Sequence, residues 1–267
     1  MDLRAFLFEP LRGRTFSARL TSTEPGLLAG VDLLLERASH LSLAVVARME
    51  DGAALQPGAC VLRVNGSPAQ IARGEEELLA CVGKPSGVAT AAARYVALAR
   101  DRARIVCGAW KKVAPELRPA LRKAIATGGA GIRLVSEPFI YLDKNHVRMF
   151  SGVSEAVARA HAMNGRVVAV QLRGETAPIA AEALTACSAG AGVLMVDTGS
   201  VKDLRAVVDI VRASGYAACV KIAFGGGVTH ERLDEVILAG AQIVDIGRAI
   251  IDARLLDFSF DIEARPP

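Results

Sequence analysis

The pattern of apolar and polar positions changes at about residue 104. Before that point, short strand-like runs are separated by turns rich in Gly and Pro, and two stretches follow the 3.6-residue period of a helix. This part is therefore expected to combine a small sheet with helices. The predicted strands are residues 16–20, 42–47 and 59–64, and the predicted helices are residues 30–38 and 87–100.

From residue 104 on, apolar runs alternate with segments of helical period. Such runs indicate parallel strands that are covered by helices on their outer side. Six strands are too few for a closed eight-stranded barrel, so the pattern favours a smaller or open (β/α) barrel. The predicted strands are residues 105–109, 139–142, 167–172, 193–196, 217–224 and 243–246, and the predicted helices are residues 115–126, 153–163, 177–187, 201–213 and 229–239.

Composition excludes several classes of protein. No apolar run approaches the roughly 18 residues of a spanning helix, and Glu9 and Pro10 interrupt the first segment, so neither a membrane partner nor a signal peptide is expected. The five cysteines lack the spacing of a metal site, which predicts no metal held by cysteines and buried free thiols in a reducing, cytoplasmic setting. The net charge is only +4 and no basic run is interleaved with aromatic residues, so no nucleic acid is expected as a partner.

Ligands bind at the carboxyl ends of the strands in a parallel barrel, and glycines gather at two of these ends. Gly225, Gly226 and Gly227 follow the fifth run and precede a helix, whereas Gly247 and Arg248 follow the sixth run. Glycine lets backbone N–H groups approach an anion, and the N-terminus of a helix adds a favourable dipole. Two such turns on neighbouring strands predict a phosphate site. The alternative is a pair of tight turns without a ligand.

Lysines are scarce in this chain, yet several lie at predicted strand ends. Lys111 and Lys112 follow the first run and Lys144 follows the second. At a strand end they could bind an anion or, if desolvated, act through a lowered pKa; on a solvated loop they would do neither. Lys221 lies inside the fifth run and would need an anionic partner if it pointed into the barrel.

Two further strand-end residues have a functional and a structural interpretation. Asp197 ends the fourth run and could bind sugar hydroxyls or magnesium, or it could cap the next helix, although Ser200 is better placed for that. His146 could contact a ligand or cap a helix. The remaining histidines are expected at the surface.

Several blocks of the sequence match, in order, the motifs of one known family. They are residues 86–90 with 94–96 (SGIATxTxxYV), 112–118 (RKTTPGLR), 142–146 (IKDNH), 193–200 (IIMLDNxS), 225–233 (SGGITLENI) and 256–262 (ALDISLDI). The chain resembles quinolinate phosphoribosyltransferase, the nicotinate-nucleotide pyrophosphorylase of NAD biosynthesis. The likeness covers nearly the whole chain.

The resemblance implies an α/β fold of two domains. Residues 1–103 would form an α/β sandwich to which residues 255–267 return, and residues 104–254 an open six-stranded (β/α) barrel. The family is a homodimer in which the N-terminal domain of one subunit covers the barrel mouth of the other. It binds phosphoribosyl pyrophosphate with Mg²⁺, displaces pyrophosphate and decarboxylates quinolinate to give nicotinate mononucleotide.

The departures from the family fall mainly where the dicarboxylate acceptor binds. They are Glu76 and Lys111 in place of arginines, Ile132 in place of a histidine, Gln171 and Ala223 in place of glutamates, and Asp143–Lys144 in place of a Lys-Asp pair. A glutamate in place of an arginine weakens the binding of a dianion. The phosphoribosyl half of the site is therefore expected to persist, and the acceptor half to have changed.

The strand-end positions and the family resemblance together assign roles to individual residues. The expected catalytic residues are Lys112, Lys144 and Asp197, the expected substrate-binding residues are Glu76, Lys111, Arg133, Asp143, His146 and Gln171, and the expected phosphate-binding residues are Gly225, Gly226, Gly227, Gly247 and Arg248. Two alternatives stay open. One is an enzyme for another phosphorylated metabolite, with Lys112 or Lys144 forming a Schiff base. The other is a non-catalytic protein that keeps the phosphate site.

Overall fold

A computed structural model describes residues 3–263, which divide into two compact units. The first unit holds the described residues up to Arg94, together with Val113–Gly129 and the residues from Ile251 on. The second unit holds Tyr95–Lys112 and Ala130–Ile250. The sequence pattern had assigned residues 113–129 to the barrel, whereas by their contacts they belong to the first unit.

The first unit contains an antiparallel sheet in the order β12-β1-β5-β3. Its strands are β1 (Phe16–Ser22), β3 (Ala44–Arg48), β5 (Cys60–Gly66) and β12 (Phe258–Ile262), and a small second sheet pairs β2 (Gly26–Leu27) with β4 (Ala54–Leu55). The helices are α1 (Leu3–Leu7), α2 (Val31–His40), α3 (Pro68–Ala99) and α4 (Arg118–Thr127), with short 3₁₀ turns at Glu9–Leu11 and Pro115–Leu117. The hydrophobic core combines Leu20 and Leu62 of the sheet with Leu34 and Leu78 of the helices.

Helix α3 is much longer than the predicted helix of residues 87–100. It begins at Pro68, where the missing N–H of proline costs no hydrogen bond, and it continues through Pro85. Gly83 and Gly87 look like helix breakers in the sequence, but they let another segment approach the helix. A Cβ at Gly87 would lie 2.0 Å from the carbonyl oxygen of Arg254, and the Leu256 N–H donates to the Gly83 carbonyl at 3.0 Å. The glycines are explained by packing rather than by a turn.

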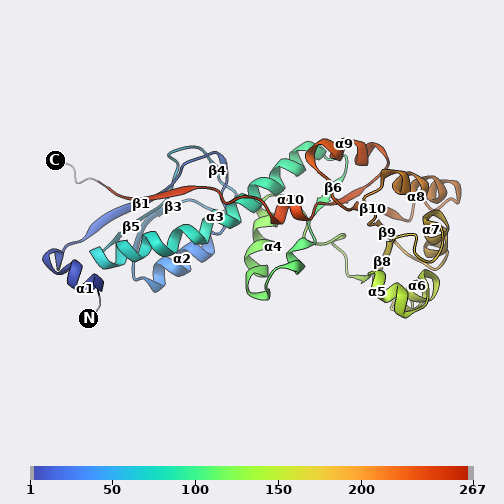
Figure 1. Ribbon diagram of the computed structural model, residues 1–267, viewed down its shortest axis with the longest axis horizontal. Coiled ribbons are helices and arrows are strands. Elements are labelled where there is room, and N and C mark those ends of the chain that lie inside the picture. Colours follow the sequence, from blue (N-terminus) through green and yellow to red (C-terminus); the bar gives the residue numbers. More distant parts are fainter. Residues whose placement is uncertain (1–2, 264–267) are drawn as a thin grey trace. The chain divides into compact units, whose positions relative to one another are not determined.

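The second unit is a six-stranded sheet of parallel strands in the order β6-β11-β10-β9-β8-β7 (Figure 1). The strands are β6 (Arg104–Val106), β7 (Phe139–Leu142), β8 (Val167–Leu172), β9 (Val193–Val196), β10 (Lys221–Gly225) and β11 (Ile243–Asp245). The connecting helices are α5 (Lys144–Met149), α6 (Val153–His161), α7 (Ile179–Ser188), α8 (Val201–Ala213), α9 (His230–Leu238) and α10 (Arg248–Ile251). Because β6 and β7 are both edge strands, the barrel is open, as the sequence predicted.

Two predicted strands are shorter than expected. The first run ends as a strand at Val106 and continues into a 3₁₀ turn, Ala109–Lys112. The fifth strand begins only at Lys221, whose side chain is exposed at the start of the strand, so this lysine needs no buried partner. Among residues 3–263, no helix is long and apolar enough to cross a bilayer.

Candidate functional site

The inner face of the parallel sheet becomes polar at the carboxyl ends of its strands. Below that edge, the inward side chains include Val193, Met195, Ala223 and Ile243, and they form a small apolar core. Side chains alternate along a strand, so residues two positions further on also point inward. These residues are Tyr141, Gln171, Asp197, Gly225 and Asp245, which together form the floor of the candidate site.

Three predicted site residues meet in one hydrogen-bond network on this floor. The Lys144 backbone N–H donates to Gln171 Oε1 at 2.8 Å, and Gln171 Nε2 donates to Asp197 Oδ2. Gln171 is almost buried, with 8% of its surface exposed. Arg173 Nη1 donates to the Asp197 carbonyl oxygen at 3.0 Å and lies 3.6 Å from Oδ2 of the same residue. The network fixes Asp197 at the end of β9.

Asp143 and His146 act on each other at the start of α5. Asp143 is the N-cap of this helix, because its Oδ1 accepts the N–H groups of Asn145 at 2.8 Å and His146 at 3.1 Å. The same oxygen lies 2.8 Å from His146 Nδ1. Burial alone would raise the pKa of Asp143, but the hydrogen bonds with His146 and Asn145 outweigh it and lower this pKa. The cap is thus Asp143 rather than His146.

The predicted cationic residues lie on exposed segments. Lys111 and Lys112 end the 3₁₀ turn after β6, and Lys144 begins α5. Lys111 Nζ lies 5.7 Å from the centre of the Tyr141 ring, which places it over the floor. None of the three has the burial that favours a neutral, nucleophilic amine.

Arg133 is also exposed, on a segment that adjoins the end of β6. Gly131 forms a parallel bridge with Val106, and the Trp110 indole N–H donates to the Ile132 carbonyl at 3.2 Å. This segment and the 3₁₀ turn of Lys111 are therefore held together. They carry three of the predicted cations, which are Lys111, Lys112 and Arg133.

The predicted glycine turn packs against a turn that sequence reasoning did not single out. Gly226 has φ +108° and Gly227 has φ +70°, values that favour glycine. Gly199, in the turn after β9, has φ +71°. A Cβ at Gly226 would lie 2.6 Å from the Gly199 backbone nitrogen, and one at Gly199 would lie 2.7 Å from the Gly226 carbonyl oxygen. The two turns thus touch backbone to backbone.

Arg232, in the first turn of α9, links the turn of Gly199 to the turn of Gly226 and Gly227 through their carbonyl groups. Its Nη2 donates to the Gly199 carbonyl at 3.0 Å, and its Nη1 donates to the Gly227 carbonyl at 3.5 Å. Gly247 and Arg248 follow β11, and because Gly225 is in register with Asp245, both turns leave the same edge of the sheet. Arg248 is exposed and begins α10.

Asp245 is the acidic residue of the floor that sequence reasoning missed. It ends β11, and its Oδ1 accepts the Gly108 N–H at 3.0 Å. Burial raises its pKa most strongly; the Gly108 hydrogen bond opposes that, and the nearby charge of Asp197 adds to it. An acidic residue at the end of an apolar run, two positions before Gly247, was the signal that could have identified it.

Comparison with known proteins places this arrangement in a family. Family models for the quinolinate phosphoribosyl transferase N-terminal domain and C-terminal domain match residues 6–86 and 88–261. The chain belongs to the quinolinate phosphoribosyl transferase family.

Curated relatives of this quinolinate phosphoribosyl transferase family member cover nearly its full length. A probable nicotinate-nucleotide pyrophosphorylase (carboxylating) of Methanothermobacter thermautotrophicus is 25% identical over 255 residues, which are 94% of this chain and 90% of that protein. The human nicotinate-nucleotide pyrophosphorylase (carboxylating) is 27% identical over 251 residues, 93% of this chain and 82% of that protein.

Solved structures agree on the fold. The nicotinate-nucleotide pyrophosphorylase from Francisella tularensis superimposes with a TM-score of 0.82 at 20% identity, covering 98% of this chain and 91% of that one. The enzyme of the same description from Pyrococcus furiosus gives a TM-score of 0.82 at 23% identity, over 96% of this chain and 72% of that one.

In this family member, Glu76 is carried by α3 of the first unit, whereas the other predicted site residues belong to the second unit. Glu76 is exposed and forms an ion pair with Arg4, whose Nη2 donates to Glu76 Oε1 at 2.7 Å. The position that carries an arginine in the family motif thus carries a carboxylate that an arginine from α1 neutralises.

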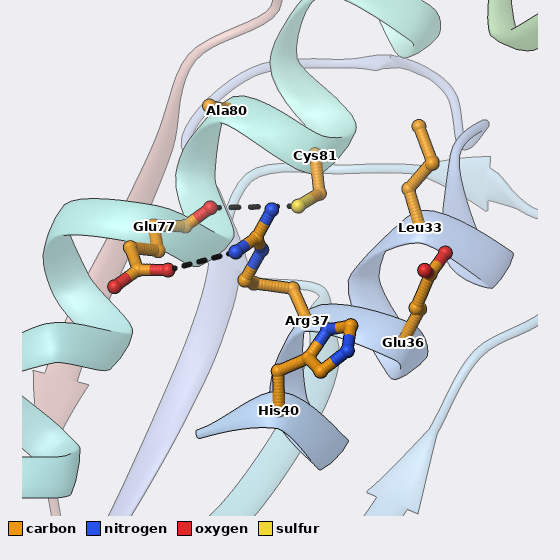
Figure 2. Close-up of a pocket in the computed structure, with 7 residues that line it drawn as sticks. All are labelled: Leu33, Glu36, Arg37, His40, Glu77, Ala80 and Cys81. Atoms are coloured by element: carbon orange, nitrogen blue, oxygen red, sulfur yellow. Dashed lines mark hydrogen bonds and ion pairs between the residues drawn. The ribbon is translucent and has the colours of Figure 1, made fainter.

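The first unit also has a surface pocket of about 450 Å³ between α2 and α3 (Figure 2). Arg37 points into it and contacts Glu77 at 3.3 Å, while burial raises the pKa of the Cys81 thiol beside them. None of the predicted site residues of this family member lines the pocket. Its arginine already pairs with Glu77, so the candidate site remains at the strand ends.

Proposed function

We propose that this protein transfers a phosphoribosyl group from phosphoribosyl pyrophosphate to a small acceptor at the floor of the open barrel, with an acceptor site changed from that for quinolinate. The observation that supports the proposal is the meeting of two glycine turns, Asp197 and several cations at one edge of the second unit. The names of the curated relatives support the same reaction type.

Each part of the edge suits one part of this substrate. The turn of Gly226–Gly227 would bind the 5-phosphate through backbone N–H groups at the start of α9. Asp197 would accept the ribose hydroxyls. Lys111, Lys112 and Arg133 would bind the diphosphate, whose negative charge grows as its bond to C1 of the ribose breaks.

The substrate would also bring a magnesium ion to the second unit. Among the described residues, no group of three His, Cys, Asp or Glu side chains could hold a metal. Mg²⁺ commonly binds one or two carboxylates together with substrate phosphates, and Asp197 is the carboxylate that would hold it. There the ion would neutralise charge on the leaving diphosphate.

The changed acceptor half rests on Glu76 and on the floor. Glu76 with Arg4 forms a neutral pair, and the floor carries the carboxylates of Asp197 and Asp245. Neither feature favours a dianion such as quinolinate. We therefore expect phosphoribosyl pyrophosphate to bind but quinolinate to be a poor acceptor.

A direct assay separates the two halves of this proposal. Binding of phosphoribosyl pyrophosphate with Mg²⁺ would be measured by calorimetry, and carbon dioxide release would be measured with quinolinate added. We expect binding, and turnover well below the ~1 per second of ordinary enzymes. Turnover at or above that rate would contradict the changed acceptor site, and absence of binding would contradict phosphoribosyl transfer itself.

Lys112→Met tests the role of the strand-end cations. We expect it to weaken binding of phosphoribosyl pyrophosphate at least tenfold, because it removes a charge-assisted contact with the diphosphate. Lys202→Met is the matched control, since Lys202 is exposed on α8. Equal binding by both variants would exclude Lys112 from the site.

The other two interpretations give different results. A Schiff-base enzyme would leave a covalent adduct with a carbonyl substrate after borohydride, which the exposure of Lys112 and Lys144 does not favour. A non-catalytic protein would bind phosphoribosyl pyrophosphate and release no pyrophosphate with any acceptor. We also propose a homodimer, as the family resemblance implies; light scattering at twice the mass of one chain would support it.

A further inference from the structure

Asp245 lies between two glycines on the floor of the site. A Cβ at Gly225 would lie 3.7 Å from Asp245 Cβ and 3.3 Å from Asp197 Oδ1, and a Cβ at Gly108 would lie 3.4 Å from Asp245 Oδ2. Gly225 ends β10 and Gly108 follows β6, the strands on either side of β11, so neither position places a Cβ against the two carboxylates. Asp245 and Asp197 therefore both lie beside Gly225 at the carboxyl ends of the strands, and Met195 Cε, 2.6 Å from a Cβ at Gly225, packs next to them.

The hydrogen bonds of Asp245 leave one oxygen for a ligand. Oδ1 accepts the Gly108 N–H, whereas Oδ2 has no hydrogen-bond partner among the described residues. The side chain is half-buried, so water can compensate Oδ2 only in part. A carboxylate oxygen in such a place is favourable only when a donor reaches it.

Gln171 cannot accept a hydrogen bond from a ligand on this floor. Its Oε1 accepts the Lys144 N–H at 2.8 Å, and its Nε2 donates to Asp197 Oδ2. Only 8% of its surface is exposed. It is neutral and ties β7, β8 and β9 together. The acidic groups that remain on the floor are Asp197 and Asp245.

From this geometry we propose that Asp245 is a substrate-binding residue, whose free oxygen accepts a ribose hydroxyl of the phosphoribosyl group while Asp197 accepts its neighbour. Vicinal hydroxyls are two adjacent donors, and two carboxylates on either side of a glycine offer two adjacent acceptors. The inference rests on the proposed function, because it assigns the sugar of that substrate.

The electrostatics of the floor are consistent with a hydroxyl ligand. Burial and Asp197 raise the pKa of Asp245, whereas Lys111 and Lys112 oppose the rise. The ionised carboxylate thus lacks part of its hydration in the free protein. A hydroxyl donor would restore a hydrogen bond without adding a further negative charge beside Asp197.

Asp245→Asn tests the inference with two probes, ribose 5-phosphate and inorganic phosphate. Both would be titrated by calorimetry into the full-length wild-type protein and the variant. We expect at least tenfold weaker binding of ribose 5-phosphate and binding of inorganic phosphate unchanged within twofold, because only the sugar would contact Asp245. Asp209→Asn, on the exposed side of α8, is the matched control and should bind both probes as the wild type does.

The outcomes separate this inference from the proposed function. Wild-type affinity of Asp245→Asn for ribose 5-phosphate would overturn the inference alone. Equally weakened binding of both probes would overturn it as well, since it would show that the substitution disturbs the whole site and not the contact with the sugar. No binding of ribose 5-phosphate or phosphoribosyl pyrophosphate by the wild type would overturn both. The fold is checked by thermal unfolding: asparagine can still accept the Gly108 N–H and removes a buried charge, so the midpoint should not fall.

Discussion

At the scale of single residues, Glu182 shows how a buried carboxylate shapes the site without lining it. This side chain of α7 is 4% exposed, and it accepts the N–H groups of Gly174 and Thr176 at 2.8 Å and the Thr176 hydroxyl at 2.8 Å. These bonds fix the loop after β8, which carries Arg173 to Asp197. Burial alone would raise the pKa of Glu182, but the hydrogen bonds outweigh it and lower this pKa.

Glu182→Gln should therefore destabilise the protein in a pH-dependent way. The variant removes a charged acceptor, so we expect a loss of about 1–3 kcal/mol in the free energy of unfolding near neutral pH. Because the folded-state pKa is lowered, the wild-type advantage is complete above the ordinary carboxyl range and is lost as the pH falls through the folded-state value. Urea titrations from pH 7 to pH 4 measure the difference.

The control for this prediction is Glu155→Gln. Glu155 also lies in the first turn of a helix, α6, but its side chain is exposed. It should change the free energy of unfolding by less than about 0.5 kcal/mol at every pH. A Glu182→Gln variant that behaves like this control would contradict the stabilising role of the buried carboxylate.

The residue scale also limits what sequence can predict about the site. Asp197, Gln171 and the glycines were identifiable because they interrupt or end apolar runs. Asp245 does the same, but it was read as part of its run. Arg232 and Gly199 could not be found from sequence, because their role depends on a contact between residues that lie 33 positions apart in the chain.

At the scale of elements, the turns after β9 and β10 work as a pair. The sequence predicts the turn after β10 from its glycines, but only the structure shows that this turn touches the turn of Gly199. The constraint on these two positions is consequently stronger than a left-handed φ alone would impose, because the space that a side chain needs is occupied by backbone.

Gly226→Ala and Gly227→Ala should differ although the residues are neighbours. Both have positive φ, which costs alanine about 1–2 kcal/mol. A Cβ at Gly226 would also strike the Gly199 backbone, whereas nothing lies within 4 Å of one at Gly227. We expect Gly226→Ala to lower the unfolding midpoint by clearly more than Gly227→Ala. Equal midpoints would show that the two turns can separate freely.

At the scale of the whole molecule, apolar runs predicted the architecture better than its details. The strands at 139–142, 167–172 and 193–196 have the predicted bounds, because strands of a helix-covered parallel sheet are near-continuous apolar runs. Helix α3 was underestimated, because Pro85 and three glycines within it mimic breaks. Contacts, not local pattern, decide that residues 113–129 join the first unit.

The cysteines of both units give a test of the packing as a whole. All five are free, as predicted, but the expectation that all are buried is wrong for Cys219, which is exposed, and for Cys60 and Cys81, which are only partly buried. Burial raises the pKa of Cys107 to about 12 and that of Cys187 to about 11. A thiol reagent at neutral pH should modify Cys219 first and leave these two unreacted while the protein is folded.

Cys219→Ser should abolish the fast phase of this reaction, and Cys60→Ser should keep it. In denaturant, the wild type should react at all five cysteines. A fast phase that survives Cys219→Ser would show that another thiol is more accessible than the structure has it.

The pairing of β12 with β1 has a consequence for biosynthesis. Ribosomes make the chain from the N-terminus, so β6 to β11 can assemble before residues 258–262 have emerged. Until then β1 is an edge strand with unsatisfied N–H and C=O groups, the kind of surface that pairs with other nascent chains. Nonsense mutations before residue 258 are thus expected to produce insoluble protein even though every barrel strand has been translated.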